Sequence, residues 1–148
     1  MVKKIQEYAT RGSLIREINL QQSTPWYSIQ LTNDEFVVSH PNMICVVNSS
    51  GTIIRSYGSR TAGSADGQLN FPGGLVQVQN GFILVADRSN NRLVILDSSL
   101  VNARVLSLPV NCGLTNPFAL HFDKSRERLY VGEHDTCRLF IFDSVCNF

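Results

Sequence analysis

The sequence predicts an all-β protein in which a four-stranded unit repeats along the chain. Three observations predict this fold class: an apolar segment that recurs, prolines at a matching spacing, and short apolar runs separated by turn residues. The segment Arg92–Asp97 is echoed 46 residues later by Arg138–Asp143 (138 − 92 = 46). A fixed period of about 20 to 50 residues is typical of proteins made of stacked repeats.

Prolines give the phase of the repeat. Pro25, Pro72 and Pro117 each begin a unit, and their spacings are 47 and 45 residues (72 − 25 and 117 − 72). The apolar run that follows each proline is expected to be the innermost strand of its unit; these runs are Tyr27–Leu31, Leu75–Val78 and Phe118–Phe122.

Each unit continues with a polar turn and further apolar runs. The second runs are 36–40, 83–87 and 129–133, rich in β-branched and aromatic residues and bounded by Gly, Asn, Asp or Ser. This pattern predicts strands joined by hairpins, and the spacing that an amphipathic helix needs is missing. Four strands in about 45 residues is typical of a propeller blade. We therefore expect a partial β-propeller of four-stranded antiparallel blades, about three blades in all.

The chain is expected to be one partial propeller over residues 1–148. It divides into a half blade at 3–20, a blade at 25–71, a blade at 72–116 and an incomplete blade at 117–148. Because blades bury their faces on one another, the first and last should expose apolar faces, and we see no polar cap at either end. Three explanations stay open: the chain is a fragment of a longer protein, two copies form a homodimer that completes the ring by exchanging strands, or the chain is a solitary curved wedge. The missing blades could also be supplied in trans.

One repeat family has residues that match this chain. Trp26 is the only tryptophan and is followed by tyrosine, which argues against the WD repeat, and Gly73–Gly74 lacks the tryptophan of kelch repeats. The run Gly67–Asp97 resembles the NHL repeat, whose pattern is roughly G-x-F-x-x-P-x-G-I-A-V followed by Y-V-A-D-x-x-N-x-R-I-x-V-F-D. The resemblance is good over Pro117–Asp143 and weak over Pro25–Gly58, where the turn is shorter and no arginine follows.

The polar positions of the motif are expected to support the scaffold. Asp87 ends the second strand and can accept backbone N–H groups from the following turn, in which Asn91 suits a left-handed conformation. Arg92 can reach Asp87 or a neighbouring blade. Glu133 and Arg138 stand five residues apart, as Asp87 and Arg92 do, and should pair in the same way (138 − 133 and 92 − 87).

Candidate binding residues lie in the loops between second and third strands and in the loops between units. In antiparallel blades these loops share one face of the disc, here called the loop face. The long Gly- and Ser-rich stretch 58–67 belongs to it and serves either for binding or as a linker between blades. The candidate residues are His40, Asn42, Arg60, Arg88, Asn90, His134 and Asp135, with His40 and His134 expected in solvated turns.

The sequence gives little support for catalysis. The expected innermost strands contain no Asp or Glu and only one histidine, His121, which we expect to be packed or hydrogen-bonded in its strand. A zinc site needs at least three protein ligands, so we expect no metal, no cofactor and no catalytic residues. The four cysteines lack Cys-x-x-Cys spacing, and no apolar run suits a membrane helix or a signal peptide. We expect reduced thiols in a cytoplasmic protein.

The leading hypothesis is a non-catalytic interaction module that recognises a protein partner. The resemblance implies a parent similar to the tripartite-motif ubiquitin ligases, in which such a propeller selects targets. Some NHL propellers bind RNA, which is the alternative, although the 13 basic and 12 acidic residues form no evident basic patch. A fragment of a six-bladed lyase or lactonase is a more distant alternative.

Overall fold

The computed structural model describes residues 3–21 and 24–143. This part of the chain forms four antiparallel sheets and two three-residue 3₁₀ turns, η1 (Gln79–Gly81) and η2 (Arg88–Asn90). The first sheet pairs β1 (Lys3–Tyr8) with β2 (Leu14–Leu20). The others are β3 (Ser28–Gln30), β4 (Phe36–His40), β5 (Met43–Val47) and β6 (Ile53–Gly58); β7 (Pro72–Gln77), β8 (Ile83–Asp87), β9 (Arg92–Leu96) and β10 (Ala103–Val105); and β11 (Pro117–Asp123), β12 (Arg128–Glu133) and β13 (Leu139–Asp143).

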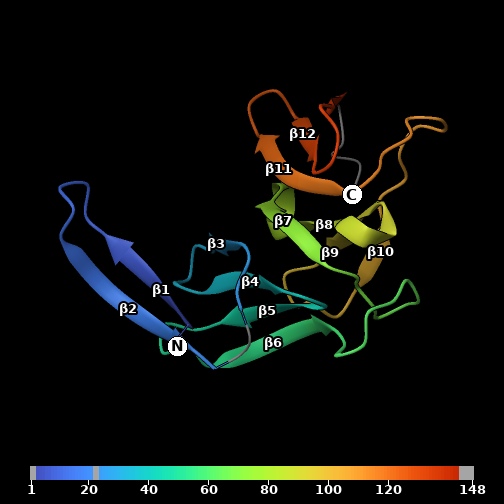
Figure 1. Ribbon diagram of the computed structural model, residues 1–148. Helices are drawn as coiled ribbons and strands as arrows, with labels where there is room; N and C mark the ends of the chain where they lie inside the picture. The colour runs from blue at the N-terminus through green and yellow to red at the C-terminus, as the bar shows by residue number, and fades with distance from the viewer. Residues whose placement is uncertain (1–2, 22–23, 144–148) are drawn as a thin grey trace.

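Within each larger sheet, strands neighbouring in sequence are neighbours in space, which is the meander of a propeller blade. Figure 1 shows the three larger sheets following one another, from β3–β6 through β7–β10 to β11–β13, with the β1–β2 hairpin beside the first. The first strands β3, β7 and β11 lie on the same side of their sheets, and β7 contacts both β3 and β11. The prediction of an all-β partial propeller is confirmed.

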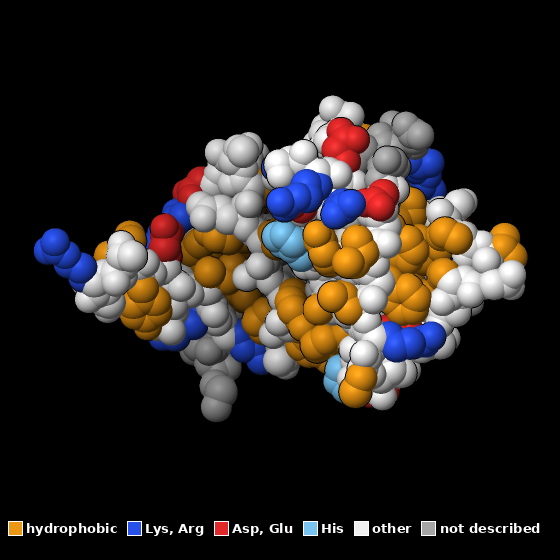
Figure 2. Space-filling view, turned by 90° about the horizontal axis from the view of Figure 1, so that it is seen from above, with side chains coloured by type: hydrophobic (Ala, Val, Ile, Leu, Met, Phe, Trp, Pro, Cys, Tyr) orange, Lys and Arg blue, Asp and Glu red, His pale blue; other side chains and the backbone are white. Residues whose placement is uncertain are grey.

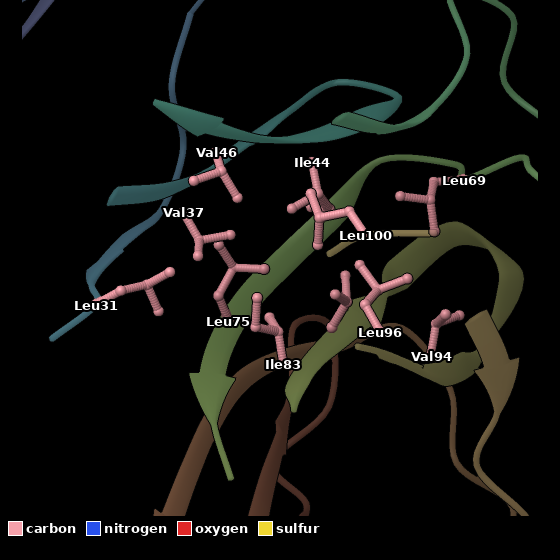
Figure 3. Packing of buried hydrophobic residues seen from close by; sticks show 11 residues of the cluster. Leu31, Val37, Ile44, Val46, Leu69, Leu75, Ile83, Val94, Leu96 and Leu100 are labelled. Atoms are coloured by element: carbon pink, nitrogen blue, oxygen red, sulfur yellow. The ribbon is translucent and has the colours of Figure 1, made fainter. Parts of the chain in front are cut away.

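The two middle blades are covered on both faces. Every residue of β4 and β8 is buried, and alternate residues pack in opposite directions. Val37 and Val46 face Ile83 and Leu96 across the interface between β3–β6 and β7–β10 (Figure 3). The other face of the first blade packs on β2 through Ile18 and Leu20, and the other face of the second packs on β11–β13. Continuous apolar runs are what strands covered on both faces require.

Adjacent blades approach most closely at a glycine pair. A methyl group built on Gly74 would lie 2.6 Å from the backbone oxygen of Phe118 and 3.1 Å from the backbone nitrogen of Leu120. Gly73 is nearly as close to the same carbonyl, at 3.0 Å. The doublet therefore lets the innermost strands β7 and β11 pack backbone to backbone, which no larger residue allows.

The last blade exposes one of its faces within the described residues. Its strands alternate between buried and exposed positions, and Leu139 and Ile141 are 63% and 53% exposed. Ala119 and His121 lie on the same face, and His121 contacts the ring of Tyr130 at 5.8 Å. Figure 2 views the molecule from above, which is the side of this blade in Figure 1. In this view hydrophobic side chains gather in the middle of the surface, beside basic side chains.

In the described part of the chain, the β1–β2 hairpin covers the opposite end of the stack with polar side chains and also exposes Tyr8, Leu14 and Ile15, so the prediction that this end has no polar cap is wrong only in part. Lys4 and Gln6 of β1 share the exposed face of the hairpin with Glu17 of β2, and Lys4 Nζ donates to Glu17 Oε1 at 2.6 Å. The alternation of these residues places polar side chains outward and Ile18 and Leu20 inward.

Strand bounds differ from the expected runs by a few residues. The innermost strand of the first blade is only Ser28–Gln30, and that of the second begins at Pro72, three residues before the predicted start at Leu75. Proline is tolerated there because the strand begins at that residue, where a ladder hydrogen bond is not required. No helix of the described part is long and apolar enough to span a bilayer.

Candidate functional site

A clasp around Asp87 fixes the loop face of the second blade. The Asp87 carboxylate is fully buried; Arg92 Nε donates to its Oδ2 at 2.6 Å, and the Asn90 side-chain amide donates to the same oxygen at 2.8 Å. Arg92 also donates to the backbone oxygens of Ser64 and Gln68, at 2.9 and 3.0 Å. Arg92 thus reaches Asp87 and also ties down the long loop before its own blade.

The backbone N–H that Asp87 accepts does not come from the following turn, as expected, but from Asn70 at 2.8 Å. The turn that follows contributes the Asn90 side chain instead, and Asn91 takes the left-handed conformation, with φ 53° and ψ 39°. The expectation was wrong because Asp87 ends β8 beside the start of its partner β7, so the loop entering β7 is the nearer donor.

The third blade repeats this clasp with Glu133 in place of Asp87. Arg138 Nε donates to Glu133 Oε2 at 2.8 Å, and the backbone N–H of Thr115 donates to Oε1 at 2.7 Å. Arg138 further donates to the Gly113 oxygen at 2.9 Å. Burial of Glu133 opposes ionisation, but hydrogen bonds from Thr136, Thr115 and Arg138 outweigh it and lower the pKa of this carboxyl to about 2.

In the first blade His40 stands where the other blades have Asp87 and Glu133. It is the last residue of β4 and only 2% exposed, so the prediction that it lies in a solvated turn is wrong. His40 belongs to the strand and not to the turn, because the pairing of β4 with β5 continues up to His40 and Met43. The replacement of the acidic residue by His40 occurs in the blade whose resemblance to the NHL repeat is weak and whose turn between second and third strands is shorter.

The remaining candidate residues are spread over the loop face. The Asn42 amide donates to the backbone oxygen of exposed Arg60 at 3.2 Å. Asn90 belongs to the Asp87 clasp and also donates to the Gly63 oxygen at 2.8 Å. Exposed His134 lies beside Asp135, with Nδ1 in contact with the Asp135 carboxylate. Arg88 lies with its guanidinium 5.9 Å from the centre of the Phe118 ring.

Sequence reasoning missed a row of aromatic side chains on this face. Trp26 stacks on Phe71 with ring centres 5.6 Å apart, and Tyr27 meets Phe118 edge to face at 5.3 Å. His134 continues the contact, 4.9 Å from Phe118. The aromatic row, defined as these five residues, runs from the first blade, which ends at Phe71 just before β7, to the third blade. A signal existed: an aromatic residue adjoins the proline that begins each unit, at 26, 71 and 118.

Phe71 is held in an unusual backbone conformation. Its φ is +49°, in the left-handed region that bulky residues avoid, and its side chain is 43% exposed. The backbone N–H of Phe71 donates to the Pro41 oxygen of the preceding blade at 2.9 Å, and the neighbouring Asn70 is fixed by Asp87. Asn116, which also precedes the proline of its unit, has φ +41°, but asparagine tolerates that conformation.

The arginines near the aromatic row differ from most of the others. Six arginines make ion pairs in the described part of the chain: Arg16, Arg55, Arg92, Arg126, Arg128 and Arg138. Arg60 and Arg88 form none with any described residue, and Arg88 Nε is buried without a hydrogen-bond partner there. The loop face therefore carries two guanidinium groups without an ion pair, of which Arg88 contacts the half-buried Phe118 ring of the aromatic row.

The other candidate sites among the described residues are weaker than the aromatic row. A shallow depression of about 260 Å³ is lined by Tyr57, Asp66, Arg92 and Arg104, but Arg92 is already engaged in the clasp. No three His, Cys, Asp or Glu side chains of the described chain gather as metal ligands would. Cys45, Cys112 and Cys137 are free thiols, and burial raises the pKa of Cys45 to about 11. Cys146 lies outside the described residues.

Residues 69–96, which span β7 to β9, match the NHL repeat. The resemblance seen in the sequence is confirmed there, while its extension to tripartite-motif proteins stays a prediction. No curated protein is a significant sequence match to the chain.

Solved propellers have a similar fold at low sequence identity. Virginiamycin B lyase from Staphylococcus aureus superposes with a TM-score of 0.65 at 16% identity, covering 95% of this chain and 48% of the lyase. A streptogramin B lyase gives 0.65 at 18%, covering 95% and 47%. The WD40 propeller domain of Doa1 gives 0.65 at 16%, covering 90% and 41%. The chain thus spans about half the length of the structures that it resembles, and at this identity the likeness concerns the fold alone.

Proposed function

We propose that this NHL-repeat propeller chain is a non-catalytic interaction module that recognises a protein partner through its loop face. The observation that carries the proposal is the aromatic row, in which Trp26 and Phe71 are exposed and the Phe118 ring lies under the guanidinium of Arg88. Arg60, exposed on the same loop face, makes no ion pair with a described residue. Exposed aromatic and arginine side chains on a rigid scaffold are enriched at protein–protein interfaces. The clasps of Asp87 and Glu133 support the proposal because they make the loops rigid.

The proposal includes a setting for the module. By its resemblance to tripartite-motif proteins, the module would be the substrate-selecting part of a ubiquitin-ligase-like protein in the cytoplasm. Free thiols such as exposed Cys137 are compatible with a reducing compartment. This part of the proposal rests on family resemblance rather than on side-chain geometry.

RNA binding is the second candidate function, because stacked aromatic rings beside arginines also suit single-stranded nucleic acid. The charge on the loop face argues against it. Arg60 and Arg88 are offset by Asp66 and by Asp135 beside His134. Nucleic acid carries one charge per nucleotide, and its affinity depends on several clustered cations.

A lyase stays an alternative because two of the similar structures are lyases. Direct assay separates the classes: incubation of the chain with virginiamycin B, followed by mass spectrometry, should leave the compound unchanged. Turnover above the rate of a Trp26→Ala and His134→Ala double variant would contradict a non-catalytic module.

A photocrosslinking experiment tests partner recognition. Benzoylphenylalanine placed at Arg60 on the loop face should crosslink to a protein in cell extract, and the same group at exposed Lys124, in the turn between β11 and β12, should not. Nuclease-sensitive products at Arg60 would favour RNA instead. Equal protein labelling at both positions would contradict recognition by the loop face.

A further inference from the structure

We infer that the aromatic row binds an extended peptide segment in which an aromatic or proline side chain stands next to an acidic residue. The inference rests on the proposed function and names its ligand. The apolar ring of the ligand would stack against Trp26 and Phe71, and its carboxylate would meet the guanidinium of Arg88 or Arg60. The apolar ring and the carboxylate of this ligand are each inferred from a feature of the described surface.

The backbone of Phe71 indicates that its ring is placed for contact. The equivalent position before Pro117 carries Asn116, which suits a left-handed conformation, whereas Phe71 keeps an unfavourable φ of +49°. The surrounding hydrogen bonds, from Phe71 to Pro41 and from Asn70 to Asp87, maintain that conformation. Strain of this kind persists where the surrounding structure enforces it, and it gathers at binding sites. The ring is held against Trp26 instead of being buried.

A preformed stack lowers the cost of binding. Trp26 and Phe71 lie nearly parallel, with an angle of 20° between their planes, so each ring fixes the orientation of the other while both keep exposed apolar surface. The rings are fixed before the ligand arrives, and little side-chain entropy remains to be lost. Proline and aromatic side chains are rigid and flat, and they suit such a surface better than flexible aliphatic ones.

Charge complementarity selects the second element of the ligand. Arg88 is anchored over Phe118, and its Nε is buried without a partner among the described residues. Because this Nε is buried, a carboxylate of the ligand would bind the terminal nitrogens of the Arg88 guanidinium, and arginine binds carboxylates with strong, directional hydrogen bonds. One or two carboxylates match Arg60 and Arg88, whereas an RNA strand would bring more charge than Asp66 and Asp135 allow.

The test uses fluorescence polarisation of labelled peptides with the full chain. The probe contains Phe-Pro flanked by Asp, and matched peptides replace Asp with Ala or Lys, or Phe-Pro with Ala-Ala; labelled oligouridine is the nucleic-acid probe. The Asp-flanked Phe-Pro peptide should bind at least about tenfold more tightly than the Lys-flanked and Ala-Ala peptides. Weaker binding of this peptide than of its Lys-flanked counterpart, or preference for oligouridine, would overturn the inference.

Variants locate the site. Trp26→Ala and Phe71→Asn should each weaken the Asp-flanked peptide by about tenfold, and asparagine keeps the backbone conformation of position 71 accessible. Arg88→Gln should weaken the Asp-flanked peptide but leave the Ala-flanked one unchanged. Matched controls are Tyr8→Ala, an exposed aromatic on β1, and Lys124→Gln, an exposed cation on another loop; both should bind as the parent chain does.

The outcomes separate the inference from the proposed function. If the Arg60 photocrosslink captures a protein while Trp26→Ala and Phe71→Asn leave peptide binding unchanged, the aromatic row is not the site and the module still recognises a protein. If no peptide of the set binds, the inference falls whatever the crosslinking shows. If oligouridine binds and the peptides do not, both fall.

Discussion

The carboxylate of Asp87 accepts the backbone N–H of Asn70 at 2.8 Å, across 17 residues of chain. This bond joins the end of β8 to the loop that enters β7, and the same carboxylate holds Arg92. The motif residues and the exposed Phe71 are therefore parts of one structure, because Asn70 immediately precedes Phe71. A change in the clasp should alter both stability and the presentation of the aromatic ring.

The clasp makes Arg92 a structural residue. Arg92→Ala should lower the free energy of unfolding by about 1–3 kcal/mol, because it leaves the buried Asp87 carboxylate without its cation. Urea denaturation followed by circular dichroism measures the change. Arg126→Ala is the control: Arg126 is 66% exposed in its pair with Asp123, so its loss should cost less than about 1 kcal/mol. Full stability of Arg92→Ala together with lost partner binding would reverse this assignment.

The close approach of β7 and β11 makes Gly74 intolerant of a side chain. Gly74→Ala should destabilise the chain by roughly 1–3 kcal/mol, since the new methyl group would meet backbone atoms of the next blade. Gly132→Ala is the matched control because its nearest neighbour is the Ala119 side chain, at the ordinary distance of 3.4 Å. Thermal unfolding compares the two; equal melting temperatures would contradict the tight packing of adjacent blades.

Glu133 should make the fold sensitive to acid. Its pKa is about 2 when folded and near the ordinary value of 4.5 when unfolded, so its ionised form adds stability above about pH 4.5. That stability should be lost as the pH falls from 4.5 towards 2. In Glu133→Gln the contribution is absent, so the difference in unfolding free energy between the parent chain and the variant should shrink over this range. A constant difference from neutral pH to pH 2 would contradict the role of Glu133.

The exposed face of β11–β13 should make the chain self-associate at micromolar concentration. Leu139 and Ile141 present apolar surface to solvent in the described chain, which soluble monomers tolerate only over limited areas. Leu139→Gln with Ile141→Thr should shift sedimentation towards the monomer. The control is Leu14→Gln, at the tip of the β1–β2 hairpin and 48% exposed. A monodisperse parent chain without dye-binding apolar surface would contradict this prediction.

Much of the fold is predictable because its physical cause is periodic. Runs such as Phe36–Val38 and Ile83–Ala86 are continuous because neighbours cover both faces, and the proline phase identifies the innermost strands. The polar face formed by Lys4 and Glu17 was missed because it appears only when the β1–β2 register is known.

The site was harder to predict because its members come from different units. His40 ends the predicted run 36–40, so its place in the strand was predictable, but its burial was not, because nothing local shows which loops cover the end of β4. The aromatic row depends on contacts between blades, such as Trp26 with Phe71, which lie 45 residues apart (71 − 26). Periodicity predicts the strands, but it does not say which loop side chains meet.

Trp26 fluorescence tests the central claim most directly, because this tryptophan is the only one in the chain. Titration with the tryptophan-free, Asp-flanked Phe-Pro peptide should change the intensity and wavelength of Trp26 emission with the same midpoint as fluorescence polarisation. Phe71→Asn should weaken both signals together. Binding by polarisation with unchanged Trp26 emission would contradict the claim that the aromatic row of the loop face is the recognition site.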